Sequence, residues 1–185
     1  MTGKLKGKTI LLGVTGSIAA FKAVDLASKL AQEEAEVVVL MTKSATKFVR
    51  PISFEAVTRG PVVTSLWAPR YYEIVESRHV SLAERADLLL IAPASANVIA
   101  KMATGICNDI LTCTALATRA PILIAPAMND NMYAHPATQH NISLLRARGC
   151  VFVGPEKGRL ASGKEGLGRL AEVSAIIEAA RKAVK

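Results

Sequence analysis

The sequence predicts an α/β fold in which a single doubly wound parallel sheet carries helices on both faces. Apolar, β-branched segments alternate along the chain with segments whose apolar residues recur at helical spacing, as in strands joined by crossover helices. The strand-like segments contain few polar residues, which is typical of a parallel sheet covered on both sides. Because 185 residues fit one domain, we expect residues 1–185 to form a single unit.

The first half of the sheet is predicted by two apolar runs. "KTILLGV" predicts a strand at residues 8–14, and the helix after it carries its apolar residues between Ala20 and Ala31 on one face. "AEVVVLM", bounded by charges, predicts the second strand at residues 35–41. A short further strand is a candidate at residues 62–64, and the polar segment 68–78 is expected to be a mobile loop.

The second half follows the same alternation. "DLLLIAP", "APILIAP" and "CVFVGP" predict strands at residues 87–93, 120–126 and 150–155, and helical patterns separate them. Apolar residues at i, i+3, i+4 and i+7 predict a final helix near residues 173–184. Ligands of doubly wound sheets bind beyond the carboxyl ends of the strands, so the segments that follow each strand are the candidate site.

Composition narrows the classes of partner. The net charge is +8, but Lys and Arg are scattered and aromatic residues make up only 4%, which leaves little for base stacking. We therefore expect a small phosphorylated ligand rather than nucleic acid. The longest apolar runs break before the roughly 20 residues of a membrane span, and the start lacks a signal-peptide pattern. We expect no membrane contact and a cytoplasmic location.

The three cysteines, Cys107, Cys113 and Cys150, lack the paired short spacings of a zinc site. Their odd number does not favour a disulfide framework. We expect reduced, mostly buried thiols and no bound metal.

The turns after the first two strands predict an anion site. Gly13 and Gly16 permit a tight turn, and Ser17 is expected to cap the next helix, whose free amides attract an anion. The pattern is not G-x-G-x-x-G, and Thr42 and Ser44 follow the second strand in place of an acidic residue, which disfavours a nicotinamide dinucleotide. An ordinary capped helix without a ligand is the alternative interpretation.

Three later segments offer polar side chains. His79 precedes a short helix near the ligand edge and is a candidate acid/base, with a purely structural histidine as the alternative. Ser95 with Asn97, and Asn108 with Asp109, stand at two helix starts, where they predict a ligand contact, a subunit contact or caps only. Asn129, in a proline-bounded loop with Met132, offers an amide that can hold a carboxylate; a turn is the alternative.

The glycine-rich, basic stretch "GRLASGKEGLGRL" at residues 158–170 predicts a flexible flap that folds over a substrate and excludes water. Lys164 and Arg169 give it positive charge, and Ser162 stands in its middle.

Four segments together resemble the FMN-dependent cysteine decarboxylase family: "GVTGSIAAFK", "HVSLAERADLLLIAPASANVIAKMATGICNDIL", "PAMNDNMYAHPATQHN" and "GRLASGKEGLGRL". They occur in order and at the family's intervals between Lys8 and Glu172. The resemblance implies a Rossmann-like, flavodoxin-like sheet, bound FMN, and decarboxylation of 4′-phosphopantothenoylcysteine to 4′-phosphopantetheine through a thioaldehyde and an enethiol. A peptidyl-cysteine oxidative decarboxylase that releases the enethiol and a non-catalytic flavin-binding regulatory subunit are the alternatives.

The resemblance also implies roles for individual residues. His79 corresponds to the family's active-site histidine, and Asn129 and Met132 to its P-x-M-N-x-x-M motif, where the asparagine holds the substrate carboxylate. The implied flavin site comprises Gly16, Ser17, Thr42, Ser44, Ser95, Ala96 and Asn97. The implied substrate clamp is residues 156–171, with Ala161, Gly163 and Lys164 at the substrate. Family members form trimers or dodecamers of trimers with FMN between subunits, and a phosphopantothenate–cysteine ligase accompanies many of them, fused or separate.

The chain departs from the family pattern at one position. The family loop reads A-C-G-x-x-G-x-G-R, and its cysteine donates the last proton, whereas this chain has Ser162 there. A thiol has a pKa of about 8.5, and a serine hydroxyl holds its proton far more tightly. Three accounts stay open: another proton donor, an engineered cysteine-to-serine change, or an oxidative enzyme that releases the enethiol.

Overall fold

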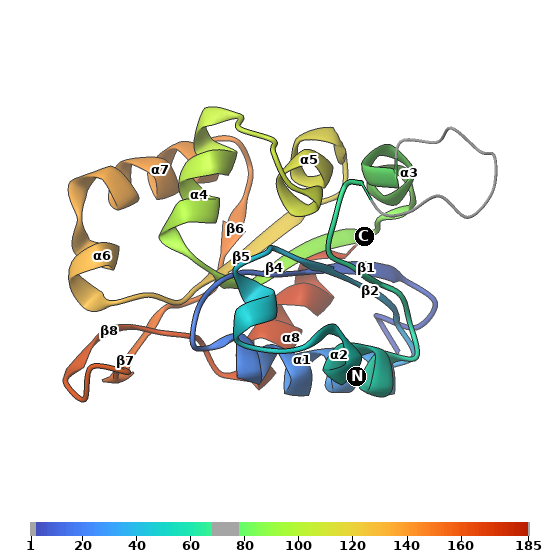
Figure 1. Cartoon of the computed structure of the whole chain (residues 1–185), viewed down its shortest axis with the longest axis horizontal. Helices are drawn as coiled ribbons and strands as arrows, with labels where there is room; N and C mark the ends of the chain where they lie inside the picture. Colours follow the sequence, from blue (N-terminus) through green and yellow to red (C-terminus); the bar gives the residue numbers. More distant parts are fainter. Residues whose placement is uncertain (1–2, 68–77, 185) are drawn as a thin grey trace.

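The fold is built around one parallel sheet with the strand order β3-β2-β1-β4-β5-β6 (Figure 1). A computed structural model describes residues 3–67 and 78–184. The order is that of a Rossmann-like sheet, in which the chain reverses its direction of winding between β1 and β4. The strands are β1 (Thr9–Val14), β2 (Glu36–Met41), β3 (Val62–Val63), β4 (Leu88–Ala94), β5 (Ile122–Pro126) and β6 (Val151–Phe152). The predicted doubly wound sheet is confirmed.

Helices cover both faces of the sheet, as Figure 1 shows. Residues alternate across each strand, so Ile10 and Leu12 of β1 pack into one apolar layer and Leu11 into the other. The first layer contains α1 (Ala20–Gln32), α2 (Pro51–Thr58) and α8 (Val173–Ala183). The second contains α3 (Arg78–Arg85), α4 (Ala96–Thr104), α5 (Ile110–Ala117) and α7 (Pro136–Ala147). The helix predicted near residues 173–184 is confirmed as α8.

A second, two-stranded sheet projects from the domain beside α6 (Asp130–Ala134) (Figure 1). Its strands β7 (Glu156–Arg159) and β8 (Glu165–Arg169) are antiparallel, and we call residues 156–169 the ribbon. The sequence predicted a flexible flap at residues 158–170 and did not predict these two strands. Gly158 pairs with Gly166 in the ladder. Because glycine is depleted in strands, the composition of this segment did not indicate strands β7 and β8.

Two smaller expectations have different outcomes. Cys107 is exposed, whereas Cys113 and Cys150 are half-buried, so the prediction of mostly buried thiols was wrong for Cys107. Burial raises the pKa of the Cys150 thiol. The predicted mobile loop at residues 68–78 lies outside the described residues, except for Arg78 in α3. Among the described residues, no helix combines the length and apolar character needed to cross a membrane.

Candidate active site

A cavity of about 1210 Å³ lies where β1, β4 and β5 end, partly beneath the ribbon. Its walls come from the turns after these strands, from the segment after β2 and from the ribbon tip. It contains most of the residues that the sequence predicted for cofactor and substrate: Gly16, Ser17, Thr42, Ser44, Ser95, Ala96, Asn97, Asn129, Met132, Ala161, Ser162 and Gly163. Residues from distant parts of the chain therefore share one site.

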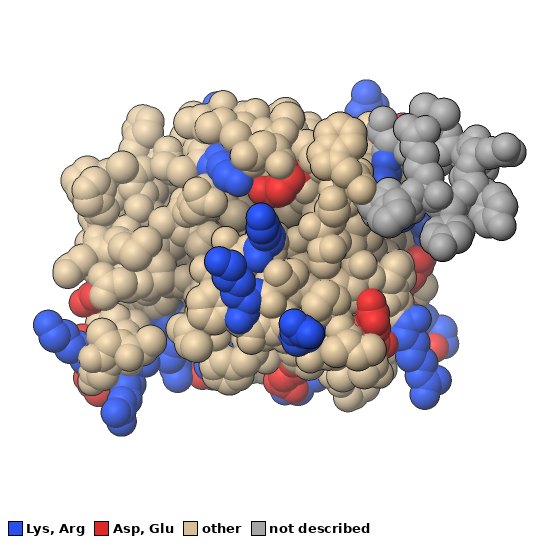
Figure 2. Space-filling model, in the orientation of Figure 1, with Lys and Arg blue, Asp and Glu red and all other residues tan. Residues whose placement is uncertain are grey.

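Positive charge predominates at this cavity. Its basic lining residues are Lys22, Lys43, Lys101, Arg159 and Arg169, whereas Asp109 is the acidic residue among them. Figure 2 shows several Lys and Arg side chains near the middle of one face of the molecule. Such a surplus attracts anionic ligands.

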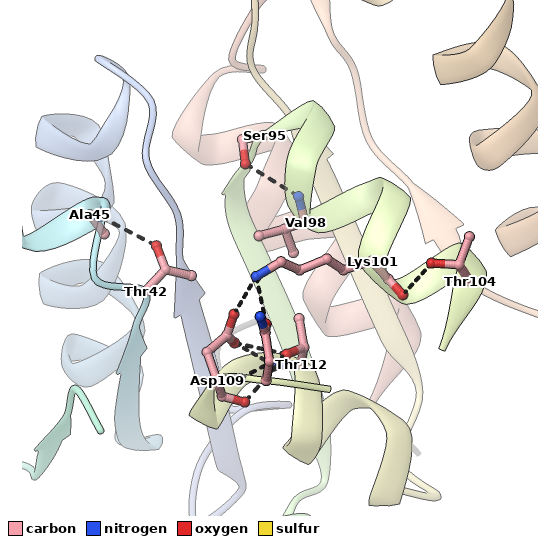
Figure 3. Close-up of polar contacts among 9 residues, drawn as sticks. Thr42, Ala45, Ser95, Val98, Lys101, Thr104, Asp109 and Thr112 are labelled. Atoms are coloured by element: carbon pink, nitrogen blue, oxygen red, sulfur yellow. Dashed lines mark hydrogen bonds and ion pairs between the residues drawn. The ribbon is translucent and has the colours of Figure 1, made fainter. Parts of the chain in front are cut away.

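The turn after β1 packs closely against the segment after β2. A Cβ placed on Gly16 would lie 2.5 Å from the Cβ of Ser44, so only glycine allows this approach. Thr42 is buried, and its Oγ1 accepts a hydrogen bond of 3.2 Å from the backbone N–H of Ala45 (Figure 3). Gly16 thereby brings the segment after β2 against the turn that precedes α1, and a helix N-terminus favours an anion.

Ser17 does not cap α1, which corrects the sequence prediction. Helix α1 begins at Ala20, and its N-cap position is Ala19, without a side-chain cap. The Ser17 hydroxyl donates to the carbonyl oxygen of Ala127 at 3.1 Å and accepts from the N–H of Ala19 at 3.3 Å. A turn intervenes between β1 and the helix, so the serine instead connects the β1 and β5 turns.

Thr15 joins the ends of β1 and β4 and was missed by sequence reasoning. Its fully buried hydroxyl donates to the carbonyl oxygen of Pro93 at 2.6 Å and accepts from the N–H of Ser95 at 2.9 Å. Ser95 in turn caps α4, accepting at 3.5 Å from the N–H of Val98 (Figure 3). Thr15 thereby sets where α4 begins. The available signal was a threonine between two glycines at a strand end.

Lys101 of α4 connects to the start of α5, as Figure 3 shows. Its Nζ donates to Asn108 Oδ1 at 2.7 Å and to Asp109 Oδ2 at 3.0 Å. Asp109 also caps α5 through a capping box with Thr112. Asp109 therefore has the capping role that one interpretation of the sequence gave it, Asn108 instead accepts from Lys101, and both line the cavity.

Asn129 is the N-cap of α6, and this fixes the orientation of its amide. Its Oδ1 accepts from the backbone N–H groups of Asn131 at 3.0 Å and Met132 at 3.4 Å. With the oxygen committed to the helix, the NH₂ group remains to donate to a ligand. Both Asn129 and Met132 line the cavity.

The ribbon tip brings Ser162 to the cavity but not Lys164. The tip is a tight turn in which the N–H of Gly163 donates to the carbonyl oxygen of Leu160 at 2.9 Å and the N–H of Leu160 to that of Lys164 at 2.8 Å. Arg159 and Ser162 line the cavity and Lys164 does not, because this turn places Lys164 on the returning arm. The prediction that Lys164 contacts the substrate is therefore not supported in this conformation.

The base of the ribbon is fixed by charge. Arg169 pairs with Glu156 at 2.8 Å and with Glu172 at 2.9 Å. The backbone N–H of Glu172 donates to Glu156, and together with Arg169 it holds the pKa of the Glu156 carboxyl below its ordinary value. The two arms of the ribbon are thus held where they leave the domain.

His79 is separated from the other predicted catalytic residues. It lies in α3, is half-buried, and is not among the residues that line the cavity. Leu82 and Ala83 bury the inner face of α3, which packs against α5 in the second helical layer. One chain therefore brings Asn129 and Ser162 together without His79.

Comparison with known proteins identifies the family to which this chain belongs. The Flavoprotein family model matches residues 1–185. The "Coenzyme A biosynthesis bifunctional protein CoaBC" of Bacillus subtilis (strain 168) is 47% identical over 178 residues, which are 96% of this chain and 43% of that protein. The chain thus spans less than half the length of this curated relative.

Solved structures agree with that assignment. A cysteine-to-serine mutant of PPC decarboxylase complexed with pantothenoylaminoethenethiol has a TM-score of 0.87 and 34% identity, covering 96% of this chain and 98% of that one. The FMN-dependent cysteine decarboxylase SpaF has a TM-score of 0.79 and 34% identity, covering 96% and 99%. The chain belongs to the Flavoprotein family, among the FMN-dependent cysteine decarboxylases close to PPC decarboxylase.

Proposed function

We propose that this chain is the FMN-dependent decarboxylase that converts 4′-phosphopantothenoylcysteine to 4′-phosphopantetheine in coenzyme A biosynthesis. The observation that carries the proposal is one basic cavity that joins an anion-binding turn at Gly16 with the amide of Asn129 and the ribbon tip at Ser162. The similarity to the bifunctional CoaBC protein and to PPC decarboxylase supports the choice of substrate.

The residues present fit FMN. Gly16 and Ser17 line the cavity in the turn just before α1, and the free backbone N–H groups of a helix N-terminus suit a phosphate. Thr42, Ser95 and Asn97 also line the cavity and add polar groups to it. The cavity volume of about 1210 Å³ exceeds the roughly 300–1,000 Å³ typical of a single small ligand, so it has room for a cofactor and a substrate.

The chemistry explains the kinds of side chain at the site. FMN held by these residues would supply hydride exchange with the cysteine side chain of the substrate. Once that side chain is a thioaldehyde, its C=S bond accepts the electrons of the departing CO₂. The Asn129 NH₂ group holds the substrate carboxylate by a neutral hydrogen bond, which opposes loss of its charge less than an arginine would. The ribbon excludes water while the thioaldehyde exists.

Ser162 stands where an acid is required at the end of the reaction. The enethiol left by CO₂ loss becomes 4′-phosphopantetheine only when one carbon of its C=C bond receives a hydride and the other receives a proton. The Ser162 hydroxyl lines the cavity, but it is a much weaker acid than a thiol, whose pKa is about 8.5. We propose that the chain completes this step and that Ser162 makes it slower than a cysteine would.

The position of His79 favours a site shared between copies. We propose a homo-oligomer, a trimer or a dodecamer of trimers, in which His79 of one copy reaches the cavity of the next and acts as acid/base. Ile18, Phe21 and Phe48 line the cavity, yet their side chains are 57%, 61% and 50% exposed in the single chain. Apolar side chains that rim a polar site are typical of surfaces covered by a partner.

Two further proposals concern the source of the substrate and the cellular compartment. Because this chain spans 43% of the bifunctional relative, we propose that a phosphopantothenate–cysteine ligase supplies its substrate, from a fused domain or a separate protein. We also propose that the protein acts in the cytoplasm, where free cysteines such as Cys107, Cys113 and Cys150 stay reduced.

Product analysis tests the reaction. Purified protein reconstituted with FMN is expected to release CO₂ from 4′-phosphopantothenoylcysteine and to form 4′-phosphopantetheine, identified by mass spectrometry. A product two hydrogens lighter would show that the enzyme stops at the enethiol. Faster turnover of a peptide ending in cysteine would show that peptides, and not 4′-phosphopantothenoylcysteine, are the preferred substrates. Protein that binds FMN but releases no CO₂ from either substrate would be a regulatory subunit.

Subunit mixing tests the position of His79. His79→Asn and Asn129→Asp are each expected to be inactive. Co-expressed in equal amounts, they should recover about a quarter of wild-type activity, because a quarter of the interfaces combine an intact histidine with an intact asparagine. If each chain built its whole site, every site in the mixture would carry one defect and the mixture would be inactive.

A further inference from the structure

Strand β8 presents two glycines on one face. Gly166 and Gly168 are two residues apart and so point to the same side of the strand, whereas Leu167 points to the other side and is 46% exposed. The glycine face packs against α6 and the loop before it. That loop carries Asn129.

Gly168 brings the backbone of the ribbon directly against the Asn129 loop. The N–H of Met128 donates to the carbonyl oxygen of Gly168 at 3.0 Å. A Cβ placed on Gly168 would lie only 2.1 Å from the carbonyl oxygen of Met128 and 3.3 Å from the carbonyl carbon of Asn129. Both partners are main chain, which a change of side-chain rotamer cannot move.

Gly166 makes a second contact on the other side of Asn129. A Cβ there would lie 2.7 Å from Oδ2, 2.8 Å from Cβ and 2.9 Å from Cγ of Asp130. Asp130 is the first residue of α6, the helix that Asn129 caps. The residues before and after Asn129 therefore both rest on the glycine face of β8.

We propose that Gly166 and Gly168 are positioning residues for decarboxylation, which set the amide of Asn129 relative to the ribbon tip that carries Ser162. This inference rests on the proposed function. Because glycine has no side chain, the Asn129 loop and the ribbon pack directly against each other and move as one body. The base of the ribbon then does not swing independently of Asn129, and movement is confined to the tip.

Gly168→Ala is the first test, in the FMN-loaded protein. The Met128 oxygen must retreat from 2.1 Å to at least 3.0 Å, a displacement of about 1 Å, and misplacing a reacting group by that distance costs about 100-fold in rate. We expect kcat for CO₂ release to fall by about that factor with FMN content unchanged. Leu167→Ala, on the opposite face of the same strand, is the matched control and should keep wild-type kcat.

Binding of two ligands distinguishes a displaced Asn129 amide from a general disruption of the cavity. The oxygen analogue 4′-phosphopantothenoylserine keeps the carboxylate, whereas 4′-phosphopantetheine lacks it. If Gly168 acts through Asn129, Gly168→Ala weakens binding of the serine analogue by at least 10-fold and leaves the Kd of 4′-phosphopantetheine unchanged. Equal weakening of both ligands, or wild-type binding of both, would refute the inference.

Gly166→Ala gives an independent second test, because its new methyl group meets mainly a side chain. A smaller loss of kcat is expected, and Asp130→Gly in the same protein should restore it by removing the three atoms that lie nearest to that methyl group. Failure of the double variant to recover activity counts against the inference. Failure of wild-type protein to release CO₂ would instead reject the proposed function.

Discussion

Replacement of Thr15 by valine isolates the contribution of one buried hydroxyl to the site. Valine has nearly the same shape, but it cannot accept from the N–H of Ser95 or donate to the carbonyl oxygen of Pro93. Each backbone group left without a partner costs about 1–3 kcal/mol. Ser95 is half-buried and can recover part of its bond from water, so we expect a loss of about 2–4 kcal/mol in the free energy of unfolding.

That loss is large enough to measure. One kcal/mol shifts the Tm of a domain of this size by about 2–4 °C, so Thr15→Val should melt roughly 5–15 °C below wild type. Chemical denaturation gives the free energy, and fluorescence titration with FMN gives the Kd of the cofactor. The Kd should rise, because the N-cap of α4 loses its anchor to β1.

Thr15→Ser is the matched control. It keeps the hydroxyl and loses only a methyl group, so it should stay within about 1 kcal/mol of wild type. If Thr15→Val were as stable as Thr15→Ser and bound FMN equally well, the hydroxyl would not be what joins β1 to α4.

Three further predictions concern the cavity and the ribbon. Asn129→Asp keeps the α6 cap but replaces the NH₂ donor by a charge that repels the substrate carboxylate; CO₂ release should fall about 100-fold or more, with FMN content and Tm near wild type. Ser162→Cys should raise the ratio of 4′-phosphopantetheine to the product two hydrogens lighter, measured by mass spectrometry in single turnover; an unchanged ratio would remove Ser162 from the proton-transfer step. Glu156→Gln should lower the Tm at neutral pH, because the folded state holds the pKa of Glu156 below its unfolded value. That stabilisation is present above the unfolded value of about 4.3 and is lost as pH falls through the folded pKa. The difference in Tm between wild type and Glu156→Gln should therefore shrink below about pH 4, and a difference independent of pH would contradict the role given to this charge.

The sequence predicted the main sheet well because the strands carry their signal locally. Strands β1, β2, β4 and β5 are runs of apolar residues buried on both faces, and the predicted ends differ from the observed ends by at most two residues. The ribbon was missed as a pair of strands because its ladder pairs Gly158 with Gly166. Glycine gives no β-propensity signal, and antiparallel pairing is a relation between two segments.

Site residues were likewise predicted correctly where their contacts are local in the sequence and missed where their partners are distant. Ser95, correctly expected at a helix start, is a cap that acts within three residues. Thr15 was missed because its partners lie 78 and 80 residues away in the chain. The family resemblance implied that Lys164 lies at the substrate, but the direction of the turn at the ribbon tip leaves it out of the cavity lining. His79 is not among the residues that line the cavity of the single chain, so its predicted role rests on the proposed oligomer.

The turns that form the site are joined by hydrogen bonds that run largely to backbone groups. Thr15 connects the β1 turn to the start of α4, and Ser17 connects it to the β5 turn at Ala127. Met128 then connects that same turn to Gly168 in the ribbon. A continuous series of bonds, largely to backbone groups, thus runs from the cofactor end of the cavity to the ribbon. Because such bonds have fixed directions, a small displacement at Thr15 should reach Asn129 through the turns. Substitutions along this series should therefore impair CO₂ release in proportion to how far they displace Asn129, even where FMN remains bound.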